Sequence, residues 1–128
     1  MALLTCYETK AELLVSLKYE ELEEIFICIS HSKNQTLCNE IKLNCDFKLP
    51  KKVFDADQAC DKEQNPDQNK ICNCKTNLYP SDDIFPKVFQ CINDRVNSLT
   101  DDEKKQMKKF EDCVSALGKA CKALPKNQ

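Results

Sequence analysis

The 128-residue chain contains a single glycine, Gly118, and no tryptophan. A fold built from β-strands needs many tight turns, and such turns use glycine freely because it accepts backbone angles that other residues avoid. The scarcity of glycine therefore argues against a β-sandwich or a β-barrel. Because apolar residues also recur at helical spacing along the chain, the sequence predicts an all-α fold.

Arginine is almost as scarce, since Arg95 is the only arginine among 19 basic residues. Proteins that read nucleic acids use clustered arginine for paired hydrogen bonds to phosphate and guanine, so we expect no nucleic-acid partner. The formal net charge is −2. No apolar run approaches the roughly 20 residues of a membrane-spanning helix, and the sequence therefore predicts no transmembrane segment.

The single histidine, His31, limits the chemistry that the chain can perform. A catalytic triad needs a base that is held beside a nucleophile, whereas His31 stands alone between two serines and is interpreted as a surface loop residue. Zinc sites typically pair cysteines across about two to four residues, but one residue separates Cys72 from Cys74. We predict that the protein is not an enzyme and holds no metal or cofactor.

Cysteine, in contrast, is abundant. An even number of cysteines spread along a short chain is typical of disulfides formed in an oxidising compartment, and it predicts a secreted, extracellular protein. The alternative is a set of reduced thiols that are buried or bind metal. We expect disulfides at all ten cysteines, which are Cys6, Cys28, Cys38, Cys45, Cys60, Cys72, Cys74, Cys91, Cys113 and Cys121.

The connectivity of these cysteines cannot be fixed from the sequence, because ten cysteines allow hundreds of pairings. One regularity favours two of them: 21 residues separate Cys6 from Cys28, and 21 separate Cys91 from Cys113. A pair of antiparallel helices of that length would place its first and last residues side by side, so we prefer Cys6–Cys28 and Cys91–Cys113. The same spacing suggests a weak two-part repeat, about 6–60 and 74–128.

Periodicity and capping signals predict a single domain, 1–128, that is a disulfide-stabilised bundle of about five to six short helices. Residues 61–83 are predicted as a long connection held by Cys72 and Cys74. Gly118 is expected to end or kink the last helix. The predicted helices begin near Thr9, cover 19–29 and 35–45, begin at Pro50, begin near Ser81 or Asp82, and begin at Thr100.

The last predicted helix carries four lysines and a regular apolar stripe. Because Met107, Phe110 and Val114 predict a face packed on the core, the lysines are interpreted as its solvated side. The alternative is a basic patch that docks an acidic partner. The lysines are Lys104, Lys105, Lys108 and Lys109. Elsewhere, the sequon that begins at Asn34 would accept a glycan in a secreted protein.

The segment from Cys74 onward contains "FQCINDRVNSLTDDEKKQMKKFEDCVSALGKAC" and resembles the microplusin-type antimicrobial proteins of ticks. The resemblance lies in the pair Cys91–Ile92, the interval to Cys113 and the further cysteine at 121. It implies a secreted, helical, disulfide-bridged protein with a role in defence. Members of that family hold copper through histidines that this chain lacks, so no copper ligand is assigned.

Together these features predict a secreted, non-enzymatic effector of the salivary, venom or haemolymph type, which binds an extracellular protein or a microbial surface. One alternative is a carrier that holds a small apolar ligand between helices. Its cavity would be lined by Phe26, Phe85, Phe89 and Phe110. Another alternative is an antimicrobial protein that uses the lysine-rich face on membranes.

Overall fold

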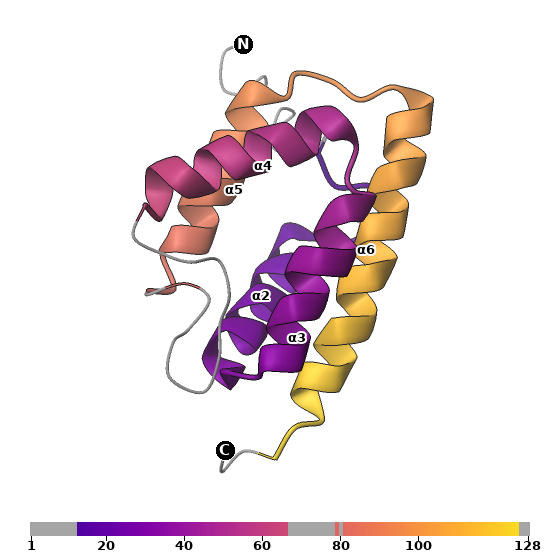
Figure 1. Cartoon of the computed structure of the whole chain (residues 1–128). Coiled ribbons are helices and arrows are strands. Elements are labelled where there is room, and N and C mark those ends of the chain that lie inside the picture. The colour runs from indigo at the N-terminus through magenta and orange to yellow at the C-terminus, as the bar shows by residue number, and fades with distance from the viewer. Residues whose placement is uncertain (1–12, 67–78, 80, 126–128) are drawn as a thin grey trace.

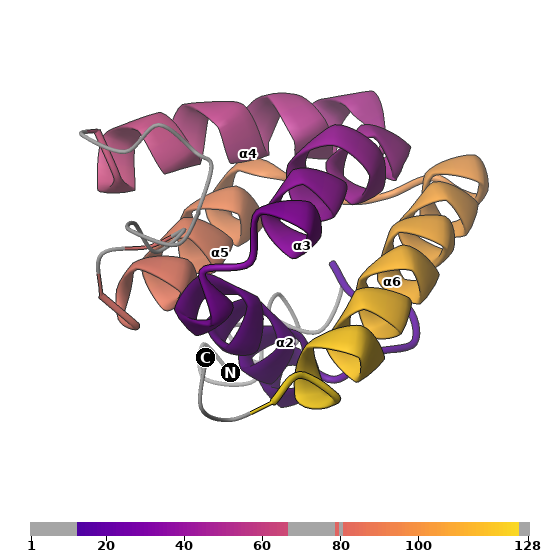
Figure 2. The same cartoon turned by 60° about the horizontal axis from the view of Figure 1, so that its bottom comes forward.

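The computed structural model describes residues 13–66, 79 and 81–125. Over these residues the fold is all-α without strands, which confirms the predicted fold class. Helices α2 and α6 pack together, as do α4 and α5, and Figures 1 and 2 both show α4 beside α5. The elements are α2 (Tyr19–Ser32), α3 (Gln35–Glu40), the π-helical turn η1 (Ile41–Cys45), the 3-10 turn η2 (Asp46–Lys48), α4 (Lys51–Gln64), α5 (Ile84–Arg95) and α6 (Asp101–Lys122).

The prediction of a helix that begins near Thr9 is wrong for the residues that the structure describes. Residues 9–12 lie outside the described residues, and residues 13–18 form bends rather than a helix. The backbone N–H groups of this segment donate to the carboxylate of Glu111 on α6 instead of to carbonyls one turn earlier. The first described helix begins at Tyr19, where the Lys18 N–H donates to Glu21 Oε1 at 3.0 Å.

The start of α6 follows its capping signal. The Thr100 hydroxyl accepts a hydrogen bond from the Glu103 N–H at 3.2 Å, and the Thr100 N–H donates to the Glu103 carboxylate at 2.8 Å. This reciprocal pair satisfies two backbone donors that a helix leaves open at its first turn. The apolar stripe of α6 is buried as predicted, with Met107, Phe110 and Val114 in the core.

Two other predicted boundaries differ. The helix expected over 35–45 stops at Glu40, and the chain continues through η1 and η2. The predicted connection 61–83 begins too early, because α4 continues to Gln64. The rest of that connection, apart from residues 65, 66, 79 and 81–83, lies outside the described residues, and so do Cys72 and Cys74.

Gly118 neither ends nor kinks α6, which continues to Lys122. A Cβ atom at position 118 would lie 2.7 Å from Cγ1 of Ile25 on α2. The glycine therefore allows α2 and α6 to approach each other closely. The sequence predicted a helix end at Gly118 because glycine is common at helix ends. In the structure, glycine is required at this position by the packing of α6 against α2.

Three disulfides lie within the described residues. They join Cys28 to Cys121, Cys45 to Cys113, and Cys60 to Cys91, with Cα–Cα distances of 6.3, 5.5 and 5.8 Å. Cys38 is also disulfide-bonded, whereas Cys6, Cys72 and Cys74 lie outside the described residues. The predicted participation in disulfides is thus confirmed for seven cysteines.

The two preferred pairings are wrong. Cys28 bonds to Cys121 because α2 packs against α6, and Cys91 bonds to Cys60 because α5 packs against α4. The equal 21-residue intervals therefore do not mark two bridged hairpins. The two-part repeat over 6–60 and 74–128 stays a prediction, without support from these bonds.

Candidate functional site

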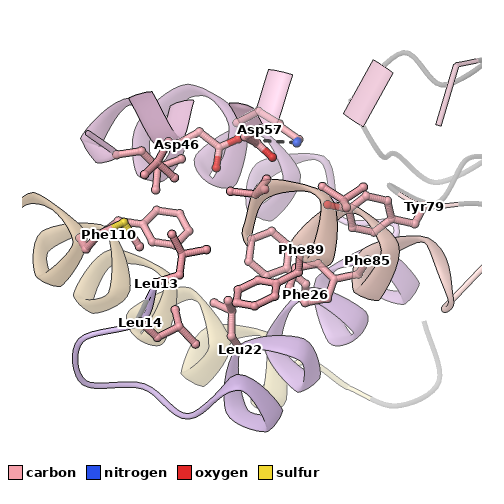
Figure 3. Close-up of a pocket in the computed structure, with 16 residues that line it drawn as sticks. Leu13, Leu14, Leu22, Phe26, Asp46, Asp57, Tyr79, Phe85, Phe89 and Phe110 are labelled. Atoms are coloured by element: carbon pink, nitrogen blue, oxygen red, sulfur yellow. Dashed lines mark ion pairs between the residues drawn. The ribbon is translucent and has the colours of Figure 1, made fainter. Parts of the chain in front are cut away.

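A small cavity of about 50 Å³ lies where α2, α4, α5 and α6 meet. Figure 3 shows the carboxylates of Asp46 and Asp57 on one side of it and Leu14 and Leu22 on the opposite side. Aromatic rings fill much of the space between them (Figure 3). The four phenylalanines that were expected to line a cavity, Phe26, Phe85, Phe89 and Phe110, all line this one.

The volume of the cavity limits what it can hold. A cavity needs at least about 10–15 Å³ to accommodate a water molecule, and a cavity that binds benzene measures about 150 Å³. The phenylalanines also pack on each other, with the ring centroids of Phe26 and Phe85 4.8 Å apart. The cavity therefore has room for water but not for an organic ligand of benzene size, and the carrier hypothesis stays a prediction without support from it.

The polar side of the cavity is an internal charge cluster around Lys42. Its ammonium lies 3.6 Å from Oδ2 of Asp46, and both side chains are almost fully buried. Burial opposes the charge on Lys42, but the surrounding acidic groups, Asp46 first among them, outweigh it and raise the pKa of Lys42 above its ordinary value. The amine therefore stays protonated inside the protein.

The pKa of Asp46 is raised as well, but here burial is the main cause of the rise. Burial raises the pKa of Asp46 from 3.8 to about 7, although the charge of Lys42 opposes the rise. The nearby carboxylates of Asp57 and Asp61 add to it by repulsion. Burial likewise raises the pKa of Tyr79, which also lines the cavity. Three carboxylates near one ammonium thus favour a proton on Asp46 at a pH where an exposed aspartate is ionised.

Sequence reasoning missed this cluster. Lys42 and Asp46 are spaced four residues apart, which is typical of exposed ion pairs on a helix surface. In the structure they face inward, whereas Leu43 and Phe47, the next residues along the chain, are each 66% exposed. Periodicity could not have found the cluster, because it assigns apolar residues to the core.

A second missed residue is Glu111, which is fully buried on α6. Its carboxylate accepts hydrogen bonds from the backbone N–H groups of Val15, Ser16 and Leu17 at 2.8, 2.8 and 2.6 Å, and from the Ser16 hydroxyl at 2.9 Å. It thereby fixes residues 15–17 on the helix. One signal could have found it: Glu111 follows Met107 by four residues and therefore falls on the apolar stripe.

The predicted basic patch lies on the solvated face of α6. Lys104, Lys105, Lys108 and Lys109 are all exposed, as the apolar stripe predicted. Lys108 forms an ion pair with Asp112, one turn later on the same helix, at 2.6 Å. Binding of an acidic partner by this patch stays a prediction.

His31 and Asn34 lie near the junction of α2 and α3. His31 belongs to the last turn of α2 rather than to a loop, and its Nε2 lies 2.6 Å from Asp82 Oδ1. Asn34 caps α3, since its side-chain oxygen accepts a hydrogen bond from the Leu37 N–H at 3.0 Å. Glycosylation of Asn34 stays a prediction.

Within the part of the chain that the structure describes, no group of three or more His, Cys, Asp or Glu side chains is arranged to hold a metal ion. None of the described helices has both the length and the apolar character needed to cross a bilayer.

These features define a class: a small all-α protein whose helices are cross-linked by disulfides and whose phenylalanine-lined internal cavity is too small for an organic ligand. The family model described as Hi1a-like, U10-hexatoxin-Hi1a, matches residues 16–122. The chain therefore belongs to this cysteine-rich spider toxin family. No curated protein and no solved structure matches the chain.

The family assignment changes one part of the sequence interpretation. The resemblance to the microplusin-type proteins of ticks finds no support, whereas the broader class of cysteine-rich effectors of the venom type agrees with the match. The reason is that the resemblance rested on cysteine spacing in the last third of the chain. Its central feature, the interval from Cys91 to Cys113, does not correspond to a bond.

Proposed function

We propose that the chain is a secreted venom effector that acts without catalysis, by binding an extracellular macromolecule with its surface. The observation that carries this proposal is the match of residues 16–122 to a toxin family. The match covers every described helix, so it concerns the whole described fold rather than one motif.

The cross-links support a role that depends on a fixed surface. Cys28–Cys121 and Cys45–Cys113 attach α2 and η1 to α6, and Cys60–Cys91 attaches α4 to α5. In the chain-entropy model, loops of these lengths correspond to about 4–5 kcal/mol of stabilisation per bond. A surface held in this way loses little conformational freedom on binding, which favours affinity.

The proposal is tested by adding the labelled, oxidised chain to intact cells and measuring bound label against concentration. A reduced and alkylated chain of identical sequence serves as the control. We expect saturable binding of the oxidised chain, displacement by unlabelled oxidised chain, and no saturable binding of the control. Equal binding of both chains would contradict the proposal, because it would show that the folded surface is irrelevant.

A further inference from the structure

The segment 42–47 has its charged and apolar side chains exchanged relative to an ordinary surface helix. Lys42 and Asp46 face the interior and form an ion pair, whereas Leu43 and Phe47 point to solvent. Each of these apolar side chains is 66% exposed, more than any other large apolar side chain that the structure describes. Single exposed apolar residues are common on proteins, but a pair that lies outside a buried ion pair is not expected from stability alone.

The local backbone maintains this arrangement. Residues Ile41–Cys45 form a π-helical turn, which is rare and often occurs at functional sites. The turn ends at Cys45, whose bond to Cys113 anchors it to α6. Ile41 and Cys45 are fully buried on either side of the exposed Leu43. The exposure of Leu43 and Phe47 is therefore set by well-anchored neighbours and not by a loose end of chain.

Phe47 extends the apolar surface onto the next helix. Its ring stacks on that of Phe54 in α4, with centroids 5.4 Å apart. We call Leu43, Phe47 and Phe54 the apolar turn. Lys48 and Lys51 are exposed beside it. The Lys48 amine donates to Asn44 Oδ1 at 2.9 Å, and the Lys51 amine forms an exposed ion pair with Asp55 at 2.9 Å.

Further positive charge lies on the neighbouring face of α6. Lys109 precedes Cys113 by one helical turn, and Cys113 is bonded to Cys45 at the base of the apolar turn. Because residues four apart share a face of a helix, Lys109 lies on the side of α6 that borders η1. Lys109 is exposed. The exposed apolar side chains thus have the amine of Lys48 next to them in the chain and Lys109 on the face of α6 that borders η1, on a molecule whose net charge is negative.

We propose that the apolar turn docks on an anionic lipid bilayer, with Leu43 and Phe47 entering the interface and Lys48 and Lys51 meeting the lipid headgroups. A stable protein interface buries about 800 Å² on each partner, which three side chains do not supply alone. A bilayer needs no complementary shape and accepts protruding apolar side chains beside lysines. The inference rests on the proposed function, since docking would concentrate the effector at cell surfaces.

The test is cosedimentation of the oxidised chain with mixed phosphatidylcholine–phosphatidylserine vesicles, compared with pure phosphatidylcholine vesicles. We expect binding to the mixed vesicles that weakens with salt. Phe47→Ser and Leu43→Ser should each lower the partition coefficient by about 10-fold, because each removes most of one large apolar side chain from the interface. Lys48→Gln should lower it by about five-fold at low salt and have no effect on pure phosphatidylcholine.

Val15→Ser is the matched control. Val15 is the remaining large apolar side chain described as exposed, at 46%, and its N–H bonds to Glu111, on the side of α6 opposite Cys113. The control should bind vesicles like the unmodified chain. Thermal unfolding of each variant shows whether it is folded. If the loss of the Phe47–Phe54 stack unfolds the Phe47→Ser variant, Leu43→Ser tests the docking proposal in its place.

Several results would overturn the docking proposal. These are no sedimentation with the mixed vesicles, equal binding of Val15→Ser and Phe47→Ser, or self-association that Phe47→Ser abolishes in the absence of lipid. The last result would assign the apolar turn to a second copy of the chain. Saturable, protease-sensitive binding to cells without vesicle binding would leave the proposed function standing and remove the lipid surface. Vesicle binding without saturable cell binding would leave the lipid-docking proposal standing and contradict the proposed function.

Discussion

Glu111→Gln replaces the buried carboxylate that holds residues 15–17 with an amide of the same shape. The carboxylate accepts three hydrogen bonds on Oε1, from the N–H groups of Ser16 and Leu17 and the Ser16 hydroxyl, and one on Oε2 from the Val15 N–H. A glutamine has only one side-chain oxygen, and it would keep the three hydrogen bonds by placing that oxygen where Oε1 lies. Its NH₂ group then faces the N–H of Val15, and two donors oppose each other.

The expected loss of stability follows from these contacts. Hydrogen bonds to a charged group contribute about 1.5–3 kcal/mol each, and an unsatisfied buried donor costs about 1–3 kcal/mol. Removing the charge also removes the desolvation cost of burying it, which offsets part of the loss. We therefore expect Glu111→Gln to lower the free energy of unfolding by about 2–4 kcal/mol, a large share of the 5–15 kcal/mol typical of domains.

The assay is equilibrium unfolding in guanidinium chloride with the disulfides intact, followed by circular dichroism. Asp112→Asn, the same kind of change at the next residue, is the control. It removes only the exposed pair with Lys108 and should change stability by less than about 1 kcal/mol. Hydrogen exchange of the amides of residues 15–17 should accelerate only in Glu111→Gln. Equal stability of the two variants, with unchanged exchange, would refute the role assigned to Glu111.

Three further predictions concern the core. Gly118→Ala should destabilise the fold by about 1–3 kcal/mol in thermal unfolding, because its Cβ would lie 2.7 Å from Ile25 Cγ1. Adding Ile25→Ala to this variant should recover part of the lost stability. A Gly118→Ala variant that is more stable than the unmodified chain would contradict the close packing of α2 on α6. The raised pKa of Asp46 means that its contribution to stability is present in full below the ordinary value of 3.8 and is lost as the pH rises to about 7. The free energy of unfolding between these pH values should therefore depend less on pH in Asp46→Asn than in the unmodified chain. The same pH dependence of this free energy in both proteins would contradict the raised pKa of Asp46. Replacing Cys60 and Cys91 together with Ala should lower unfolding stability by about 2–5 kcal/mol, and a mass map that joins either cysteine to another partner would refute the pairing.

Much of the helical structure could be predicted from local sequence. The capping box at Thr100, the stripe of Met107, Phe110 and Val114, and Pro50 before α4 are short-range signals, and the structure agrees with each. The disulfide pairings could not be predicted in this way. They depend on which helices pack together, and the interval between cysteines along the chain carries no information on that.

The candidate site was the least predictable part. Glu111, Lys42 and Asp46 are charged, and charge is ordinarily a sign of a surface position, whereas Leu43 and Phe47 are apolar and yet lie exposed. Their actual positions depend on contacts with segments far away in the sequence, such as residues 15–17 and Cys113. Gly118 belongs to the same group, because the reason for its presence is a side chain on another helix.

The docking account depends on which side chains of residues 42–47 face outward, and amine modification of the native protein tests this directly. The oxidised chain is treated with an acetylating reagent, digested, and analysed by mass spectrometry. The account predicts rapid modification of Lys48 and Lys51 and protection of Lys42, whose side chain is 12% exposed and ion-paired with Asp46. Modification of Lys42 at the rate of its exposed neighbours would contradict the inward orientation of the ion pair, and with it the outward orientation of Leu43 and Phe47.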